Sequence, residues 1–349
     1  MNSPEEINTA AASAPESFWK RYVAAFAARL ERMPWLLPLL SFGWGWLSFA
    51  MVRRGEEFAH LMALLAFIGW PWLLVEPFIR KYLEKITPGK LTKLAIDFVT
   101  QSLQQELLFF SLPFIIGATQ FDAGQLAFTA TVIGAALIST IDPIYNRLVA
   151  PRPLIKMIFH AYCSWLAALV VLPMAVHLPL ERALPVALIF VIVWFTITLR
   201  RTLYALTTLP QRALWVLLCV VIPCAIWFGR DNIPAAGLST RDACITQSIE
   251  NLVPGEPVKT IALADALEHG VIAFVAIRAP SGLSQELVFE WHHNGSTDKI
   301  PAEIHGGSTT GYRTWSRKRN LTENPTGKWV VDVRTPQGQL LKRLRFRVE

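Results

Sequence analysis

Apolar residues are distributed unevenly along the chain. Residues 35–230 contain several long apolar runs, whereas residues 231–349 contain no apolar run of membrane length. A helix needs roughly 20 mainly apolar residues to cross the hydrocarbon core of a bilayer. The pattern therefore predicts an integral membrane protein in which a helical part is followed by one folded polar domain.

Seven runs in the first part approach the length of a span. They predict a polytopic α-helical membrane bundle of about seven spans within residues 35–230. The first run is short and rich in glycine, so the first two runs could instead form a re-entrant hairpin. The seven runs are 35–52, 58–79, 97–119, 123–142, 156–177, 182–199 and 213–229.

Basic residues differ in number between the two sides of this predicted bundle. With a cytoplasmic N-terminus, 15 Lys and Arg residues fall in cytoplasmic segments and three fall in outer loops. Positive residues concentrate in cytoplasmic loops of membrane proteins. The asymmetry predicts a multi-pass protein whose C-terminal domain lies outside the cytoplasm, joined by the short linker 231–239.

The N-terminal arm, residues 1–34, is predicted to be cytoplasmic. Large apolar residues recur every four positions within 16–33 and are flanked by basic residues. This pattern is typical of an amphipathic helix that lies in the membrane interface. A helix packed on the cytoplasmic ends of the bundle would show the same pattern, so both interpretations stay open.

Ionisable residues within the predicted spans are candidates for a functional site, because a charge at membrane depth is costly. They could line a polar cavity that handles a lipid headgroup, an ion or protons. Alternatively, residues near span ends reach the interface or pair with a neighbouring Arg. Glu106 is the candidate nearest mid-bilayer, and the others are Glu76, Asp97, Asp142 and His160.

Residues 240–349 alternate between apolar and polar positions, as strands with one buried face do. Clear runs end at His293, Val333 and Val348, and Thr335–Gly338 has the composition of a type I turn that closes a hairpin between 328–334 and 339–348. About seven strands predict an all-β, immunoglobulin-like sandwich. The runs lie at 242–249, 271–277, 287–293, 299–305, 311–318, 329–333 and 344–348.

Aromatic and histidine residues offer further candidates in this domain. Trp291, Trp315 and Trp329 could all fill the core or rim, or one of them could form an aromatic platform for a sugar. Adjacent residues on a strand point to opposite faces, so His292 and His293 are unsuited to one metal ion. No metal site is predicted.

Arginines alternate with apolar residues on the last strand and recur on an earlier one. They could form a cationic surface for phosphates or carboxylates if the two strands share a sheet. A charged edge strand that discourages aggregation would look the same. The residues are Arg313, Arg317, Arg343, Arg345 and Arg347.

Three segments carry a resemblance to known families: Phe289–Gly295, Tyr312–Lys318 and Gly327–Val333. With the closing run 338–348, they resemble the bacterial domain-of-unknown-function family 2914, over about 240–349. Residues 1–230 resemble the membrane family of unknown function 5924 that accompanies it. The resemblance implies a bacterial envelope protein and no activity. Combined with the topology predicted from the loop charges, it predicts a protein of the bacterial inner membrane with a periplasmic C-terminal domain.

Charge and motifs narrow the function. The chain has a net charge of +7, but residues 231–349 carry 14 basic and 13 acidic residues, so the excess reflects topology and no nucleic-acid partner is predicted. There is no Walker-type loop, HExxH or GxSxG, and no catalytic residue or cofactor is predicted.

Two functions stay open. One is a binding or scaffold protein that presents the β-sandwich to an envelope protein, an anionic glycan or lipid headgroups, an interpretation that rests on fold-level analogy. The other is a membrane enzyme or transporter that handles a lipid-linked or anionic substrate through the polar groups of the bundle.

Overall fold

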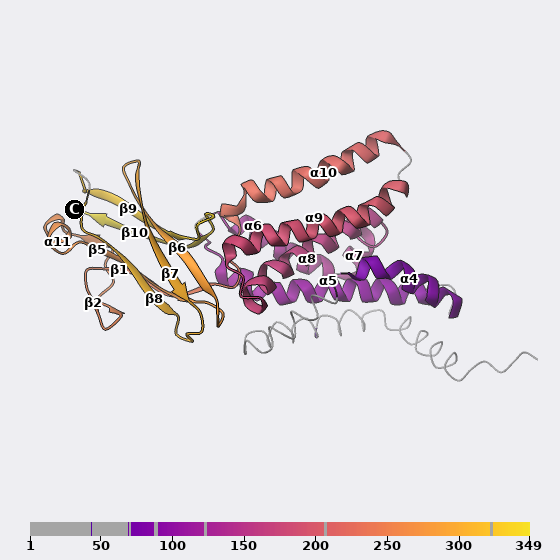
Figure 1. Cartoon of the computed structure of the whole chain (residues 1–349), viewed down its shortest axis with the longest axis horizontal. Coiled ribbons are helices and arrows are strands. Elements are labelled where there is room, and N and C mark those ends of the chain that lie inside the picture. Colours follow the sequence, from indigo (N-terminus) through magenta and orange to yellow (C-terminus); the bar gives the residue numbers. More distant parts are fainter. Residues whose placement is uncertain are drawn as a thin grey trace, which may run out of the picture.

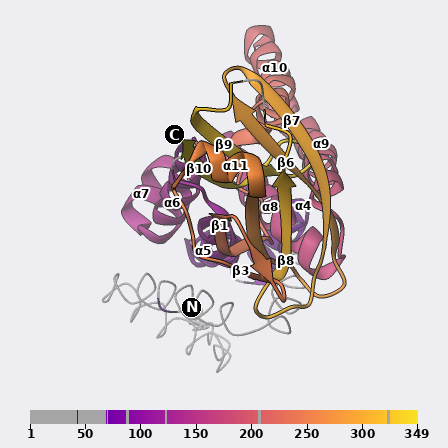
Figure 2. The same ribbon diagram turned by 90° about the vertical axis from the view of Figure 1, so that its left-hand side faces the viewer.

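The computed structural model describes residues 43, 69, 71–86, 90–121, 124–205, 208–321 and 324–349. The chain has a helical part and a β-rich part that follow each other along the long axis of the molecule (Figure 1). Seen from the β-rich end, the strands lie in front of the helices (Figure 2).

The helical part is organised around two long helices, α5 and α8, which run in the same direction, since Lys156 at the start of α8 lies beside Asp97 in the first half of α5. Their facing side chains form a core that includes Leu108, Leu166 and Val170. Proline opens α7, α8 and α10, where a missing backbone N–H costs nothing. The helices are α4 Trp72–Ile86, α5 Lys90–Ala118, α6 Leu126–Thr140, α7 Asp142–Leu148, α8 Pro153–Ala175, α9 Leu180–Ala205 and α10 Leu209–Phe228.

The expected bundle of about seven spans is wrong. Within the described residues, only α8, α9 and α10 are long and apolar enough to cross a membrane. A fourth span is possible in length and composition if α6 and α7, which meet at an angle of 98°, are counted as one broken helix. Several helices are thus compatible with a membrane, but fewer than the apolar runs suggested.

The discrepancy has a physical cause in α4, α5 and α6. Helix α5 has 29 residues, but its first half carries Asp97 and a series of glutamines, which leaves too short an apolar stretch to cross a bilayer. Helices α4 and α6 have 15 residues each, about 22 Å of helix. The first run, most of the second, and the arm 1–34 lie outside the described residues apart from Gly43 and Gly69.

The C-terminal part is β-rich, as expected. Each of the seven predicted strands corresponds to a strand of the structure, and the predicted hairpin is confirmed as β9 paired antiparallel with β10. The strands are β1 Ser239–Thr246, β2 Ile249–Glu250, β3 Val253–Pro254, β4 Thr260–Ile261, β5 Val271–Arg278, β6 Ser284–His293, β7 Ser296–His305, β8 Tyr312–Lys318, β9 Gly327–Arg334 and β10 Leu340–Val348.

The strands form two main sheets, in the orders β1-β5-β8 and β4-β10-β9-β6-β7. Their inward side chains share one core, in which Trp291 and Trp329 pack against Phe346. The pairs β2-β3 and β4-β10, and the short helix α11 Leu263–His269, were not anticipated. Strand β5 is buried on both faces, because Cys244 and Ile249 pack on its outer side.

The β-rich part is joined to the helices by hydrogen bonds between side chains and backbone. The Gln285 Oε1 accepts a hydrogen bond from the Leu180 N–H at 2.7 Å, at the start of α9. Gln125, just before α6, donates to the Leu340 carbonyl at 3.0 Å, and Arg230 donates to the Gln337 carbonyl at 2.8 Å. These three bonds, here called the docking seam, place the β domain directly on one end of the helices.

Candidate functional site

A compact ion cluster joins α4, α5 and α8 at the end of the helices opposite the β domain. The Lys156 Nζ lies 3.2 Å from Glu76 and 3.4 Å from Asp97. The Arg80 Nη2 lies 2.7 Å from Glu76 and 3.8 Å from Asp97. Two carboxylates therefore face two cations, so that the mostly buried cluster is electrically balanced.

Polar contacts continue from this cluster along α5. Gln101 donates to the Asp142 carboxylate at 2.7 Å and to the Ser139 carbonyl, at the bend between α6 and α7. One turn further, the Gln104 Oε1 accepts a hydrogen bond from the Tyr145 hydroxyl at 2.7 Å. Residues at this spacing share one face of a helix, so α5 turns its polar stripe inward.

The structure thus brings Glu76 and Asp97 together and connects Asp142 to the same stripe. His160 is fully buried in α8, one turn after Lys156. Glu106 does not join this group: it lies nine residues after Asp97, which places it about 14 Å along α5 and on the opposite face. The predicted mid-bilayer candidate is therefore separate from the ion cluster.

A second charged cluster lies on the outer face of the five-stranded sheet. Asp332 on β9 is only 1% exposed and receives hydrogen bonds from Arg343 and Arg334 at 2.6 and 2.8 Å. Burial acts to raise the pKa of the Asp332 carboxyl, but the two arginines outweigh it and lower that pKa overall. Next to it, Glu290 pairs with Lys299 at 2.7 Å.

His292 completes a set of potential metal ligands with Glu290 and Asp332, whose ligand atoms lie within 4.8 Å of one another. The residues fit a divalent cation poorly, because both carboxylates already face cations, including Arg334 at 3.2 Å from Glu290. A metal ion would have to displace ion pairs that satisfy the buried carboxylate of Asp332. The cluster serves instead to neutralise the face of the sheet.

The predicted basic residues do not share a sheet. Arg313 and Arg317 lie on β8 in the three-stranded sheet, whereas Arg343, Arg345 and Arg347 lie on β10 in the five-stranded sheet. Each set is on the outer side of its own sheet, because the alternating residues point into the common core. The condition for one continuous cationic surface is not met.

The three tryptophans separate clearly. Trp291 and Trp329 are each 1% exposed and fill the core. Trp315 is 39% exposed and lies on the outer face of β8, between Arg313 and Arg317 at alternate positions. Only Trp315 of these three offers an indole surface to solvent.

An open hollow of about 710 Å³ lies beside Trp315, within the usual size range of ligand sites. Strand β8 provides one wall through residues 312–315. The loop between β7 and β8 contributes the hydroxyls of Ser308 and Thr310, which lie 3.2 Å apart. Glu303 and Leu252 complete the lining, so hydroxyl, carboxylate, guanidinium and indole groups meet at one place.

Local sequence explains how the hollow is held. A Cβ on Gly306 would lie 1.6 Å from the Pro280 carbonyl oxygen, so only glycine allows the loop before β8 to pack there. Opposite it, Leu252 has φ +63°, a left-handed conformation that is uncommon for a leucine. Arg313 donates to the Leu252 carbonyl at 3.2 Å and fixes this turn against β8.

The hollow lies at the end of the β domain nearest the helices. The loop that carries Ser308 is bonded through Gly306 to the Leu283 carbonyl at 2.7 Å. A Cβ on Gly282, in the same turn, would lie 3.5 Å from the ring of His177, which connects α8 and α9. A ligand in the hollow would therefore be bound close to the helical part.

Sequence reasoning identified Arg313 and Trp315 but not the groups that surround them. Ser308, Thr310 and Glu303 come from a loop and a strand edge, where no periodicity marks a binding role. The left-handed conformation of Leu252 could not be predicted from the sequence, because glycine and not leucine is the residue type that usually indicates such a conformation. Lys156 is the first residue of the predicted span 156–177 and was not a candidate, because its pairing with Glu76 depends on the packing of α4 against α8.

Two family comparisons match the chain. The family described as "Family of unknown function (DUF5924)" matches residues 16–273, and that described as "Protein of unknown function (DUF2914)" matches residues 284–348. The expected order of the two families is confirmed, but the boundary lies between β5 and β6, inside the β domain. No curated protein and no solved structure is detectably similar. Since the first match covers most of the length of the chain, the chain belongs to the family of unknown function DUF5924 and continues into a DUF2914 region.

Proposed function

We propose that the protein is a membrane-anchored binding protein whose β domain binds an acidic glycan in the hollow beside Trp315. The observation that carries this proposal is the exposed indole between two arginines, at the rim of a hollow lined by hydroxyls. Large aromatic side chains are normally buried, as Trp291 and Trp329 are here. An exposed one beside a polar hollow is a candidate binding surface.

The chemistry of the hollow suits a saccharide that bears acid groups. The C–H face of a sugar ring stacks on an indole face, which is apolar and carries a negative quadrupole. Sugar hydroxyls match the hydroxyls of Ser308 and Thr310 and the Glu303 carboxylate. Guanidinium groups bind carboxylates and phosphates in fixed geometry, so Arg313 in the lining, with Arg317 beyond it on the same face of β8, favours an acidic glycan over a neutral one.

A protein partner is less well supported by this lining. Protein interfaces are centred on well-packed, desolvated apolar pockets. Within the hollow, Leu252 is the one aliphatic side chain among the lining residues, and it is half exposed at the tip of a turn. Five of the other lining residues are Ser, Thr, Glu or Arg, so the hollow offers polar groups beside its aromatic side chains and suits a hydrophilic ligand that also has an apolar face.

The membrane anchor gives the hollow its location. Basic residues gather at the ends of helices far from the β domain, including Lys81, Lys85, Lys93, Arg147, Arg152 and Arg212, whereas Arg182 and Arg230 lie near it. By the positive-inside rule, the distal end faces the cytoplasm and the β domain lies outside it. The docking seam then keeps the ligand close to the outer surface of the membrane.

The ion cluster of α4, α5 and α8 fits a supporting role in this account. Its charges are balanced, and its groups are paired with one another. A balanced cluster has little capacity left for an anionic substrate, whereas breaking it would leave buried charges without partners. It therefore holds the cytoplasmic ends of three helices together.

Retention of the purified full chain on immobilised alginate, a polyuronate, tests the proposal, with neutral dextran as the comparison. We expect the wild type to bind alginate and not dextran, and Trp315→Ala to weaken alginate binding about tenfold, the effect of roughly 1.4 kcal/mol. Leu267→Ala removes a more exposed apolar side chain, on α11, and should bind normally. Equal binding by both variants, or no binding by the wild type, would refute the glycan site.

A further inference from the structure

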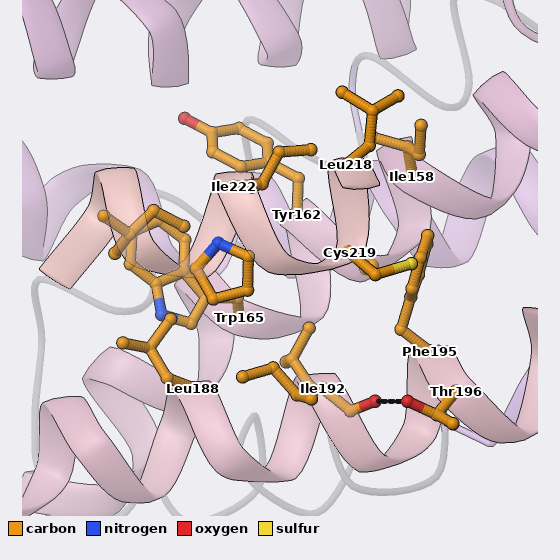
Figure 3. Close-up of a pocket in the computed structure, with 14 residues that line it drawn as sticks. Ile158, Tyr162, Trp165, Leu188, Ile192, Phe195, Thr196, Leu218, Cys219 and Ile222 are labelled. Carbon is orange, nitrogen blue, oxygen red and sulfur yellow. Dashed lines mark hydrogen bonds between the residues drawn. The ribbon is translucent and has the colours of Figure 1, made fainter. Parts of the chain in front are cut away.

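A second pocket, independent of the hollow, lies between α8, α9 and α10 (Figure 3). It holds about 190 Å³, more than the roughly 150 Å³ cavity that accommodates benzene in a protein interior. Its walls are almost entirely aliphatic and aromatic, and the Cys219 sulfur on α10 points toward Phe195 on α9. The three helices that line it are those long and apolar enough to cross a membrane.

The few polar groups in the wall are already engaged or are donors only. The Thr196 hydroxyl donates to the Ile192 carbonyl at 2.7 Å, as drawn in Figure 3. The Tyr162 hydroxyl shares a hydrogen bond with Thr131 at 2.8 Å. The Trp165 Nε1 is buried and has no hydrogen-bond partner among the described residues. The wall thus contains no charged side chain among the described residues.

The dimensions fit an extended chain. The lining residues run from Ile158 to Trp165 on α8 and from Leu218 to Ile226 on α10, about 11 to 12 Å along each helix axis. Helix α10 has no buried residue in its most apolar 18-residue window, and the pocket lies along its half-buried face, which turns toward α8 and α9. A filler of the same apolar character would complete the packing.

We infer that this pocket binds one acyl chain of a bilayer lipid. The occupant is specified by the walls: a linear hydrocarbon chain matches their apolar chemistry, and lipid tails surround helices of this composition. The apolar walls contact the acyl chain of the lipid and not its headgroup, so the pocket tolerates different headgroups. This site is separate from the proposed glycan hollow, which lies on the β domain.

Native mass spectrometry of the detergent-solubilised full chain tests the inference. We expect the wild type to retain one phospholipid per chain after detergent exchange. Cys219→Trp fills the pocket and should reduce retention at least fivefold. Cys224→Trp adds the same bulk to an exposed position of α10 and should retain lipid as the wild type does. Thr196→Trp, on the opposite wall, gives the same test if Cys219→Trp fails to fold.

Headgroup and chain dependence complete the experiment. Exchange of phosphatidylcholine for phosphatidylglycerol with the same tails should leave retention unchanged, whereas six-carbon tails should not be retained. The inference is overturned if the wild type carries no lipid, or if Cys224→Trp loses lipid as much as Cys219→Trp does. It is also overturned if the protein forms a lipid-free dimer and Cys219→Trp disrupts that dimer while Cys224→Trp does not.

Discussion

The Lys156 Nζ lies 3.2 Å from a carboxylate oxygen of Glu76, although 80 positions separate the two residues in the chain. The contact ties the first turn of α8 to α4, and Asp97 of α5 completes it at 3.4 Å. The ion cluster fixes one end of the helices, and the docking seam fixes the other end to the β domain. The β domain that contains the hollow is therefore attached to helices whose distal ends are themselves fixed by the ion cluster.

Removing the cation at the centre of the ion cluster should destabilise the helical part. Lys156→Met leaves Glu76 and Asp97 with Arg80 alone, and breaking a buried ion pair in this way costs about 3–5 kcal/mol. Thermal unfolding of the full chain in detergent measures the loss. The double variant Lys156→Met/Asp97→Asn should recover part of it, since one unpaired charge is removed. Additive losses would show that the two residues do not interact.

The docking seam should depend on one glutamine. Gln285→Leu leaves the buried Leu180 N–H without an acceptor, which costs about 1–3 kcal/mol. Hydrogen exchange by mass spectrometry should show faster exchange at the start of α9. The matched control is Gln247→Leu, because the Gln247 Nε2 has no hydrogen-bond partner among the described residues. Unchanged exchange in Gln285→Leu would contradict the seam.

The pKa of Asp332 predicts a pH dependence of folding. That pKa is lowered in the folded protein, whereas an unfolded Asp has a pKa of about 3.9. The folded state is therefore favoured above the unfolded pKa, and this contribution is lost as the pH falls through the folded pKa.

Acid titration of unfolding below pH 5 measures this contribution. Asp332→Asn should be less stable than the wild type at pH 7, because Arg343 and Arg334 lose their charged partner. It should also lose less stability between pH 5 and pH 2. Parallel curves for the two proteins would contradict the assignment.

Membrane orientation can be tested with two exposed positions at opposite ends of the molecule. Leu267 lies on α11 in the β domain and is 58% exposed, and Tyr82 lies near the distal end of α4 and is 66% exposed. In a Cys224→Ser background, Leu267→Cys should react with an impermeant maleimide on intact cells, and Tyr82→Cys only after permeabilisation. The reverse order would place the hollow in the cytoplasm.

The β domain was largely predictable, and the helical part was not. Alternation with period two marks each long strand, and Thr335–Gly338 marks the hairpin, since these depend on local sequence. The span count failed because α4 and α6 have only 15 residues each and because polar residues interrupt the apolar stretch of α5. In α5, Gln101 and Gln104 face Asp142 and Tyr145, so the helix is stabilised by its polar stripe.

The candidate site was predictable only in part, for a related reason. Trp315 and Arg313 stand out as residue types, but burial alone separates Trp315 from Trp291 and Trp329. The assignment of Arg313 and Arg343 to different sheets follows from strand order, which depends on long-range pairing. The alternation along a strand predicts which residues share a face of that strand. The strand order of the sheets decides which of these faces lie next to one another.

Calorimetric titration of the full chain with an oligouronate tests the central claim most directly. Arg313→Ala and Arg345→Ala remove the same charge from different sheets, so they form a matched pair. The account predicts that Arg313→Ala weakens binding about tenfold and lowers its salt dependence, whereas Arg345→Ala binds as the wild type does. Equal weakening by both variants would show that binding follows net charge alone, and it would contradict a site in the hollow beside Trp315.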